Sequence, residues 1–358
     1  FEHVWFRGNQ TNSGVQEQYA KKGGAVFADQ GGLASFRDVE FSENVASSIG
    51  GAVAIEFPDT SKIILFERTT FLNNGVEPTW ENNIDRVARG GALYFERAGK
   101  TIIDKSAFYS NYVQIQGGRN GNSGGAVYFG PSFNSFIINS SRFQNNRIYT
   151  PNDNNGGEAF GGAIHVDRIQ GDFKLTNSLF TNNSSEAGFY TWDSGSEDVS
   201  AKSGAIEISL AEYFDQSGNP VINYESQLIN NTFYNNKAIG SGNVDGQGAT
   251  LRYADHQKSI LLNNIFAADS ANNRPNSKEE YNYSLYNIFN NPTSILFAYN
   301  NSSDLKRTTE YLNEYGDNNI NREPGLLLDS SQDAHQLSDV SRLIGAGALS
   351  YDGYQAPS

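Results

Sequence analysis

The sequence contains no cysteine and no methionine, and it has only nine prolines and four histidines among 358 residues. Without cysteine, neither a disulfide framework nor a thiolate metal site can form. No apolar run approaches the ~18 residues of a membrane-spanning helix, so we expect no membrane span in this segment. A net charge of −14 argues against nucleic acid or an anionic membrane as a partner.

Asparagine, serine, glycine and tyrosine are abundant instead, with 36 glycines and 19 tyrosines. An acidic, cysteine-free chain of this composition is typical of proteins outside the cytoplasm. We therefore expect a secreted or cell-surface bacterial protein.

A Gly-Gly-Ala-Val-like tetrapeptide recurs along the chain, with one complete copy at 124–127. The second glycines of successive copies are 27, 40, 34, 37, 42 and 44 residues apart, if two degraded copies near residues 203 and 247 are included. Recurrence at such intervals is the mark of a repeat protein. The other complete copies begin at Gly23, Gly50, Gly90 and Gly161.

A second motif, Phe-x-x-Asn, alternates with the glycine motif. The position five residues before its phenylalanine is apolar in every copy, which marks a short strand. The seven copies are Phe6/Asn9, Phe41/Asn44, Phe71/Asn74, Phe108/Asn111, Phe143/Asn146, Phe180/Asn183 and Phe233/Asn236.

Strands this short cannot bury a face alone, so successive repeats must stack about 4.8 Å apart. With three strands expected per turn, the pattern predicts an all-β fold, a parallel β-helix, which the crossover rule makes right-handed. We expect about seven recognisable coils over residues 1–270. Residues 271–358 are expected to form irregular C-terminal rungs and the cap of the same solenoid.

The motif residues have physical roles in this fold. The paired glycines permit a positive φ or a close approach that a Cβ would prevent. The asparagines predict a ladder at a bend, in which each side-chain amide bonds to the next coil.

The alternation of these two motifs resembles the repeats of polymorphic outer-membrane proteins, which are autotransporter-type bacterial adhesins. The resemblance covers roughly residues 1–270, and the ending at 341–354 is similar to the closing segment of secreted right-handed β-helix proteins. The resemblance implies a parallel β-helix exposed on the cell surface, with adhesion as its usual role. Both motifs are architectural, so they are specific for the fold.

Along the glycine strands, residues one step after the inward Val or Ile point outward, and a carboxylate column follows two steps later. The first column includes Tyr94, Tyr128, His165 and Glu207, and an aromatic column beside carboxylates predicts a carbohydrate-binding groove walled by loops. The loops add aromatic contact candidates. A solvated sheet face is the alternative interpretation. The loop candidates are Trp80, Tyr190 and Trp192, and the second column is Asp29, Glu56, Glu96 and Asp167.

A catalytic interpretation of the same groove also exists. Glu56 and Glu96 on adjacent coils have a spacing suited to a glycoside hydrolase. Alternatively, Glu96, Tyr128, His165 and Asp167 could supply the base and acid of a polysaccharide lyase. We expect no cofactor, although stacked carboxylates are also compatible with Ca²⁺.

Two hypotheses therefore stand: an adhesive or structural β-helix that binds a glycan or another surface, and a secreted polysaccharide lyase or glycoside hydrolase. The spread of aromatic and acidic residues over several coils favours the first. Because Phe1–Phe6 begins inside a coil, we also expect further chain, or another copy, to cover that end.

Overall fold

The structure is a computed structural model. It describes residues 1–11, 22–29, 35–56, 61, 63–78, 88–115, 122–131, 134–150, 158–187, 200–210, 224–240, 250–253 and 258–267, and short strands at 213–214, 220–221, 245–247, 270–271, 285–286, 295–298, 301–302, 326–329, 334–337, 350–351 and 354–355. Among these residues, no helix is long and apolar enough to cross a membrane.

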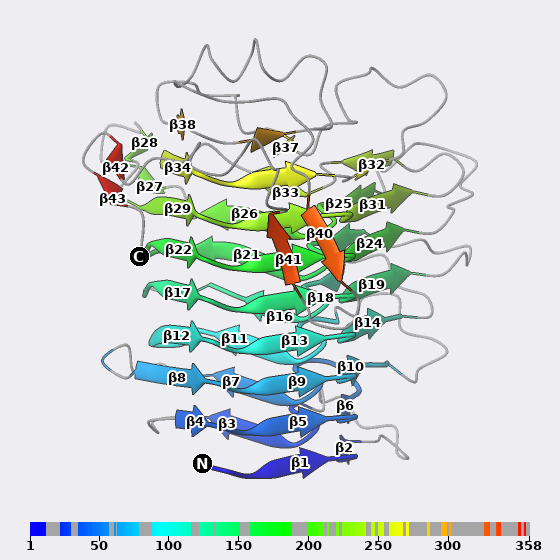
Figure 1. Cartoon of the computed structure of the whole chain (residues 1–358). Coiled ribbons are helices and arrows are strands. Elements are labelled where there is room, and N and C mark those ends of the chain that lie inside the picture. Colours follow the sequence, from blue (N-terminus) through cyan, green and yellow to red (C-terminus); the bar gives the residue numbers. More distant parts are fainter. Residues whose placement is uncertain are drawn as a thin grey trace.

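The described residues form the parallel β-helix that the sequence predicts (Figure 1). Each coil adds one strand to each of four parallel sheets, rather than the three strands per turn expected. The sequence missed the sheet that follows the asparagine, because its strands are as short as two residues and begin what reads as a loop.

The aliphatic sheet opens each coil. Its strands are β4 (Ser35–Arg37), β8 (Ile63–Glu67), β12 (Lys100–Asp104), β17 (Phe136–Asn139), β22 (Phe173–Thr176), β29 (Glu225–Ile229), β34 (Lys258–Leu262) and β38 (Ile295–Ala298). The phenylalanine sheet follows it. Its strands are β1 (Trp5–Arg7), β5 (Glu40–Ser42), β9 (Thr70–Leu72), β13 (Ala107–Tyr109), β18 (Arg142–Gln144), β23 (Leu179–Thr181), β30 (Thr232–Tyr234), β35 (Ile265–Ala267) and β39 (Asn301–Ser302).

The post-asparagine sheet and the glycine-strand sheet complete the coil. The former contains β2 (Gln10–Thr11), β6 (Val45–Ala46), β10 (Gly75–Val76), β14 (Tyr112–Gln114), β19 (Arg147–Thr150), β24 (Ser184–Ala187), β31 (Lys237–Gly240) and β36 (Ser270–Ala271). The latter contains β3 (Val26–Asp29), β7 (Val53–Glu56), β11 (Leu93–Glu96), β16 (Val127–Phe129), β21 (Ile164–Ile169), β26 (Ile206–Leu210), β33 (Leu251–Tyr253) and β37 (Leu285–Tyr286).

A fifth parallel sheet joins these two in the later coils, and three antiparallel pairs lie outside the coil pattern. The fifth sheet contains β15 (Asn122–Ser123), β20 (Ala159–Phe160), β25 (Ser200–Lys202) and β32 (Asp245–Gln247). The pairs are β27 (Tyr213–Phe214) with β28 (Pro220–Val221), β40 (Leu326–Asp329) with β41 (Ala334–Leu337), and β42 (Ser350–Tyr351) with β43 (Tyr354–Gln355).

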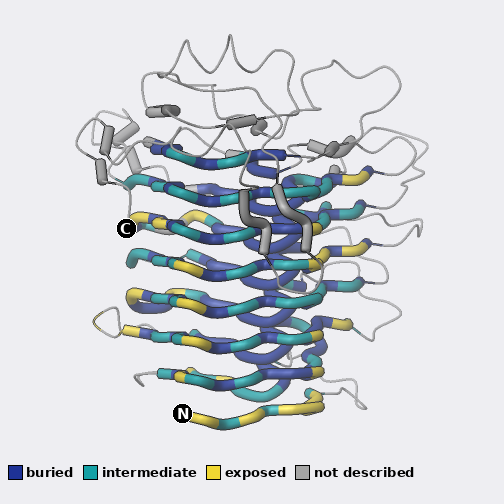
Figure 2. The backbone as a smooth tube through the Cα atoms, in the orientation of Figure 1, coloured by how far each residue is buried: buried dark blue, intermediate teal, exposed yellow. Residues whose placement is uncertain are grey.

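The core consists of buried residues from successive coils, and they follow one another along the axis of the solenoid (Figure 2). Phe71, Phe108 and Phe143 stack almost parallel, with ring centroids 4.6 Å apart at both steps. Inward residues predicted on the glycine strands, such as Val53 and Leu93, are fully buried. At the first coil Phe1 and Trp5 are exposed, and the expectation that more chain or another copy covers this end stays a prediction.

The predicted asparagine ladder is present. Within it, the Asn74 side chain donates to the Asn111 side-chain oxygen at 3.0 Å, and Asn111 donates to Asn146 at the same distance. A second ladder lies at the bend before the phenylalanine strand. It was not predicted from the sequence, because its members differ in residue type. It runs through Thr69, Ser106, Ser141, Ser178, Asn231 and Asn264, each backbone N–H donating to the next side-chain oxygen.

The two glycines of each pair have different roles. Gly50 has φ 61°, a left-handed conformation that other residues adopt only with strain. Gly51 has no such φ, but a Cβ on it would lie 2.0 Å from the carbonyl oxygen of Gly91 in the next coil. The first glycine therefore turns the chain, and the second lets neighbouring coils approach.

Candidate functional site

The outward column of the glycine-strand sheet aligns in register as predicted: Tyr94 pairs with Tyr128, Tyr128 with His165, and His165 with Glu207. The expectation that this column faces solvent is wrong. Tyr94, Tyr128, His165 and Glu207 are 3%, 0%, 8% and 1% exposed. Their rings and polar groups therefore do not form an open aromatic platform.

A second column covers them, formed by the residue directly before each glycine pair. We call Ile49, Arg89, Ser123, Phe160 and Lys202 the cover column, and these residues pair in parallel from coil to coil. The turn at the left-handed glycine brings this residue back over the strand that follows. This position shows no repeat signal in the sequence because it holds a different residue type in each of these coils.

Specific contacts show how the cover column packs. Ile49 clusters with Tyr94 and Tyr128. The Arg89 guanidinium lies 4.6 Å from the centre of the Tyr128 ring, which is a cation–π contact. The Phe160 ring stacks on His165 with centroids 5.3 Å apart.

The carboxylate column beside them remains accessible, with Glu56, Glu96 and Asp167 half-buried. The buried tyrosines reach it through their hydroxyl groups. Tyr94 donates to Glu96 at 2.6 Å, and Tyr128 donates to Asp167 of the next coil at 2.7 Å. These tyrosines therefore hold the carboxylates in place instead of presenting their ring faces.

Gly130 occupies the carboxylate-column position between Glu96 and Asp167, and it makes the second of these bonds possible. A Cβ on Gly130 would lie 2.9 Å from both a Tyr128 ring carbon and the Phe95 carbonyl oxygen. A larger residue would push the Tyr128 ring aside. Packing against Tyr128 therefore explains why this column has a glycine in place of a carboxylate at position 130.

Burial perturbs the ionisation of the site. Burial raises the pKa of both tyrosine hydroxyls, and the bond from Tyr94 to Glu96 adds to the effect. Burial lowers the pKa of His165 to about 3, against the attraction of Asp167. Burial opposes ionisation of Asp167 too, but nearby His165 and the hydrogen bond from Tyr128 keep its pKa below the usual value. His165 is therefore neutral at physiological pH.

Among the described residues, a buried side-chain atom of the outward column has no hydrogen-bond partner. His165 Nδ1 is buried and forms no hydrogen bond within the described part of the chain. One coil further on, buried Glu207 accepts from Ser203 at 3.1 Å and is paired with Arg252. Burial raises the Glu207 pKa, against the effect of Arg252.

The proposed catalytic residues are brought into neighbouring coils, but each carboxylate is engaged. Glu56 pairs with Glu96 in register, as predicted. Glu56 accepts from Lys22 at 2.6 Å, however, and Glu96 accepts from Tyr94. Asp167 binds both Tyr128 and Arg168. Trp80, Tyr190 and Trp192 lie outside the described residues.

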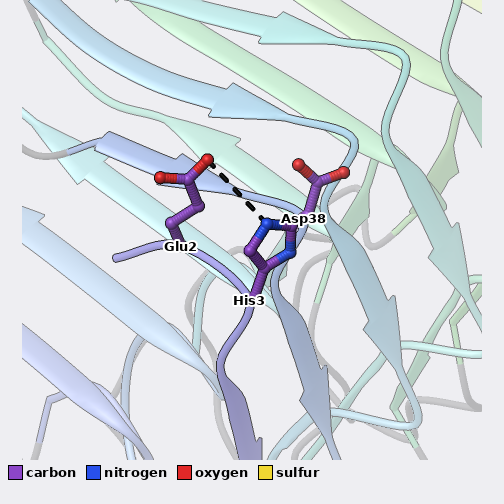
Figure 3. A group of neighbouring side chains, drawn as sticks. All are labelled: Glu2, His3 and Asp38. Carbon is purple, nitrogen blue, oxygen red and sulfur yellow. Dashed lines mark ion pairs between the residues drawn. The ribbon is translucent and has the colours of Figure 1, made fainter.

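Only one group of potential metal ligands converges among the described residues: Glu2, His3 and Asp38 (Figure 3). The stacked carboxylates of the glycine-strand sheet do not form such a group. Glu2 and His3 are exposed, and His3 Nε2 lies 3.9 Å from the Glu2 carboxylate. Both Asp38 oxygens already accept from Arg68 at 2.7 Å. The cluster therefore forms a surface ion-pair network, with no ligand set prepared for a metal.

No protein-family model, no curated protein and no solved structure matches the chain. The strand pairing alone identifies its architecture as a parallel β-helix solenoid.

Proposed function

We propose that the chain is the scaffold of an extracellular or cell-surface bacterial protein with an adhesive or structural role. The observation that carries the proposal is the pair of side-chain ladders that run from coil to coil beside the phenylalanine stack. Each buried asparagine of the ladder through Asn74, Asn111 and Asn146 is hydrogen-bonded to its neighbours, which favours one rigid, extended arrangement over a mobile one. The resemblance to polymorphic outer-membrane-protein repeats, autotransporter-type adhesins, supports the same role.

The glycine-strand face is the proposed contact surface for a glycan or another cell surface. The half-buried carboxylates Glu96 and Asp167 are oriented by tyrosine hydroxyls, and oriented carboxylates accept hydrogen bonds from sugar hydroxyls. We assign stacking against sugar rings to the predicted loop aromatics Trp80, Tyr190 and Trp192. Tyr94 and Tyr128 act through their hydroxyls.

Binding to a panel of neutral and acidic glycans tests this proposal. Glu96→Gln and Tyr94→Phe should each weaken binding severalfold, because one removes the charge and the other removes the bond that orients it. Glu40→Gln on the phenylalanine sheet makes the same chemical change away from the face and should leave binding unaltered. Equal loss in all three variants, or no loss in any, would contradict a glycan site here.

A second candidate is the polysaccharide lyase or glycoside hydrolase. It is favoured by one observation: groups with perturbed pKa values, Tyr128, His165, Asp167 and Glu207, lie on three successive coils, and such groups are common at active sites. Unsaturated uronate absorbance or new reducing ends, lost in Glu96→Gln or His165→Ala, would establish turnover. Binding without turnover supports the scaffold.

A further inference from the structure

A surface hollow of about 520 Å³ lies on a different part of the coil, where the phenylalanine sheet bends into the post-asparagine sheet. The strands that follow this bend are β6, β10, β14 and β19 (Figure 1). The volume of the hollow falls in the ~300–1,000 Å³ range of small-molecule sites. It spans four coils, or about 14 Å along the axis. Its lining residues are Glu43, Val45, Asn73, Ser110, Tyr112, Asn145 and Arg147.

Gly75 makes room for the Tyr112 ring, which lines this hollow. In register, it lies between Val45 and Tyr112. The Tyr112 ring leans across it, so that a Cβ on Gly75 would lie 2.2 Å from the ring carbon that bears the hydroxyl. The hydroxyl donates to Glu77, which fixes the ring. A half-buried aromatic ring held in this way offers its outer face to a ligand.

The bend residues form one wall. Asn73, Ser110 and Asn145 all have a left-handed φ, of 53°, 54° and 56°. Their side chains form no hydrogen bond with any part of the chain that the structure describes. Donors and acceptors at coil spacing are thus available to the hydroxyl groups of a ligand.

Arg147 is exposed, and among the described residues it is the charged group of the hollow that has no ion-pair partner. Glu43 is already paired with Arg7 at 3.0 Å, and Glu77 is engaged by the Tyr112 hydroxyl. Arg147 follows Tyr112 in the register of the sheet and forms no ion pair among the described residues. In a chain of net charge −14, an available guanidinium beside a fixed ring is a specific anion-binding group.

We propose that this hollow binds a short acidic carbohydrate through a carboxylated pyranose. Arg147 contacts the carboxylate, the Tyr112 ring packs against the sugar face, and Asn73, Ser110 and Asn145 bond to hydroxyls. The site is separate from the glycine-strand face and does not depend on the function proposed for that face.

The test uses two probes that differ only in the carboxylate: methyl glucuronide and methyl glucoside. Titration of the whole chain, followed by ligand-observed NMR, should show the glucuronide bound about tenfold more tightly. Arg147→Gln should abolish that preference. Arg97→Gln, an equal charge change at the bend after β11, should retain it, since Arg97 is exposed and remote in the coil from β19.

Two further variants separate this site from the alternatives. Gly75→Ala displaces the Tyr112 ring and should weaken binding of both sugars, with circular dichroism confirming the fold. Glu96→Gln on the glycine-strand face should change neither affinity. The proposal is overturned if neither sugar binds, if both bind equally, if Arg97→Gln matches Arg147→Gln, or if only Glu96→Gln abolishes binding.

Discussion

Asn111→Ala is the most direct test of what the asparagine ladder contributes. The Asn111 side chain is fully buried and bonds to coils on both sides. Its nitrogen donates to the Phe71 carbonyl and to the Asn146 side-chain oxygen, and its oxygen accepts from the backbone and side chain of Asn74, all at 3.0 Å. Alanine removes these four bonds at once.

The size of the loss in stability depends on which polar groups the substitution leaves without a hydrogen-bond partner. The Asn74 backbone N–H loses its acceptor in a buried position, and an unsatisfied buried group costs about 1–3 kcal/mol. The Asn74 side chain, the Phe71 carbonyl and the Asn146 oxygen each keep another bond. We therefore expect Asn111→Ala to lower the free energy of unfolding by about 2–4 kcal/mol.

Chemical denaturation measures the total loss, and hydrogen exchange of the Asn74 amide reports the local loss. Asn9→Ala is the internal control, because the exposed Asn9 side chain donates a single bond, to Asn44 at 2.8 Å. It should cost about 1 kcal/mol or less. If Asn111→Ala costs no more than Asn9→Ala and the Asn74 amide stays protected, the ladder does not stabilise the coil as argued.

Three further predictions concern the glycines, the core and pH. Gly51→Ala should cost several kcal/mol in denaturation experiments because two backbones must separate, whereas Gly8→Ala, with open space around its Cβ and φ 64°, should cost only about 1–2 kcal/mol of strain. Phe108→Ala removes a ring from the middle of the stack and should cost about 3–5 kcal/mol by the same measurement; a loss under 1 kcal/mol would mean that the coils repack. His165 has a folded pKa of about 3 and an unfolded one near 6.5, so the unfolded chain binds the proton first, and stability present above pH 6.5 falls as the pH drops toward 3. His165→Gln should show a smaller fall than the parent over that range, and parallel stability curves would refute the assignment.

The fold was predictable because its repeated contacts require particular residues. Only asparagine offers both donor and acceptor at the right reach for the ladder through Asn74 and Asn111, and only glycine fits the contact at Gly51. The post-asparagine sheet escaped prediction because its pairing is carried by backbone atoms, so that Gly75, Tyr112 and Arg147 can occupy equivalent positions. Backbone pairing of this kind imposes no side-chain pattern.

The candidate site was predictable in position but not in exposure. Alternation along the strand correctly placed Tyr128, His165 and Glu207 in one column of adjacent coils. Their burial depends on Arg89, Phe160 and the other residues of the cover column. These residues all directly precede a glycine pair, but they have no chemical property in common. The hollow beside Tyr112 was missed for a related reason: it is defined by a side chain absent at Gly75, and absence leaves no motif.

Because adjacent coils make the same contacts, the structure also suggests how such a chain can change length during evolution. Phe71 and Phe108 occupy the same position in adjacent coils, as do Asn74 and Asn111. A recombination event that joined Phe71 directly to Tyr109 would remove one whole coil, yet Asn44 would then meet Asn111 where it now meets Asn74. Duplication would act in the same way in reverse. The gene can therefore lengthen or shorten the protein by one coil without needing any new kind of contact.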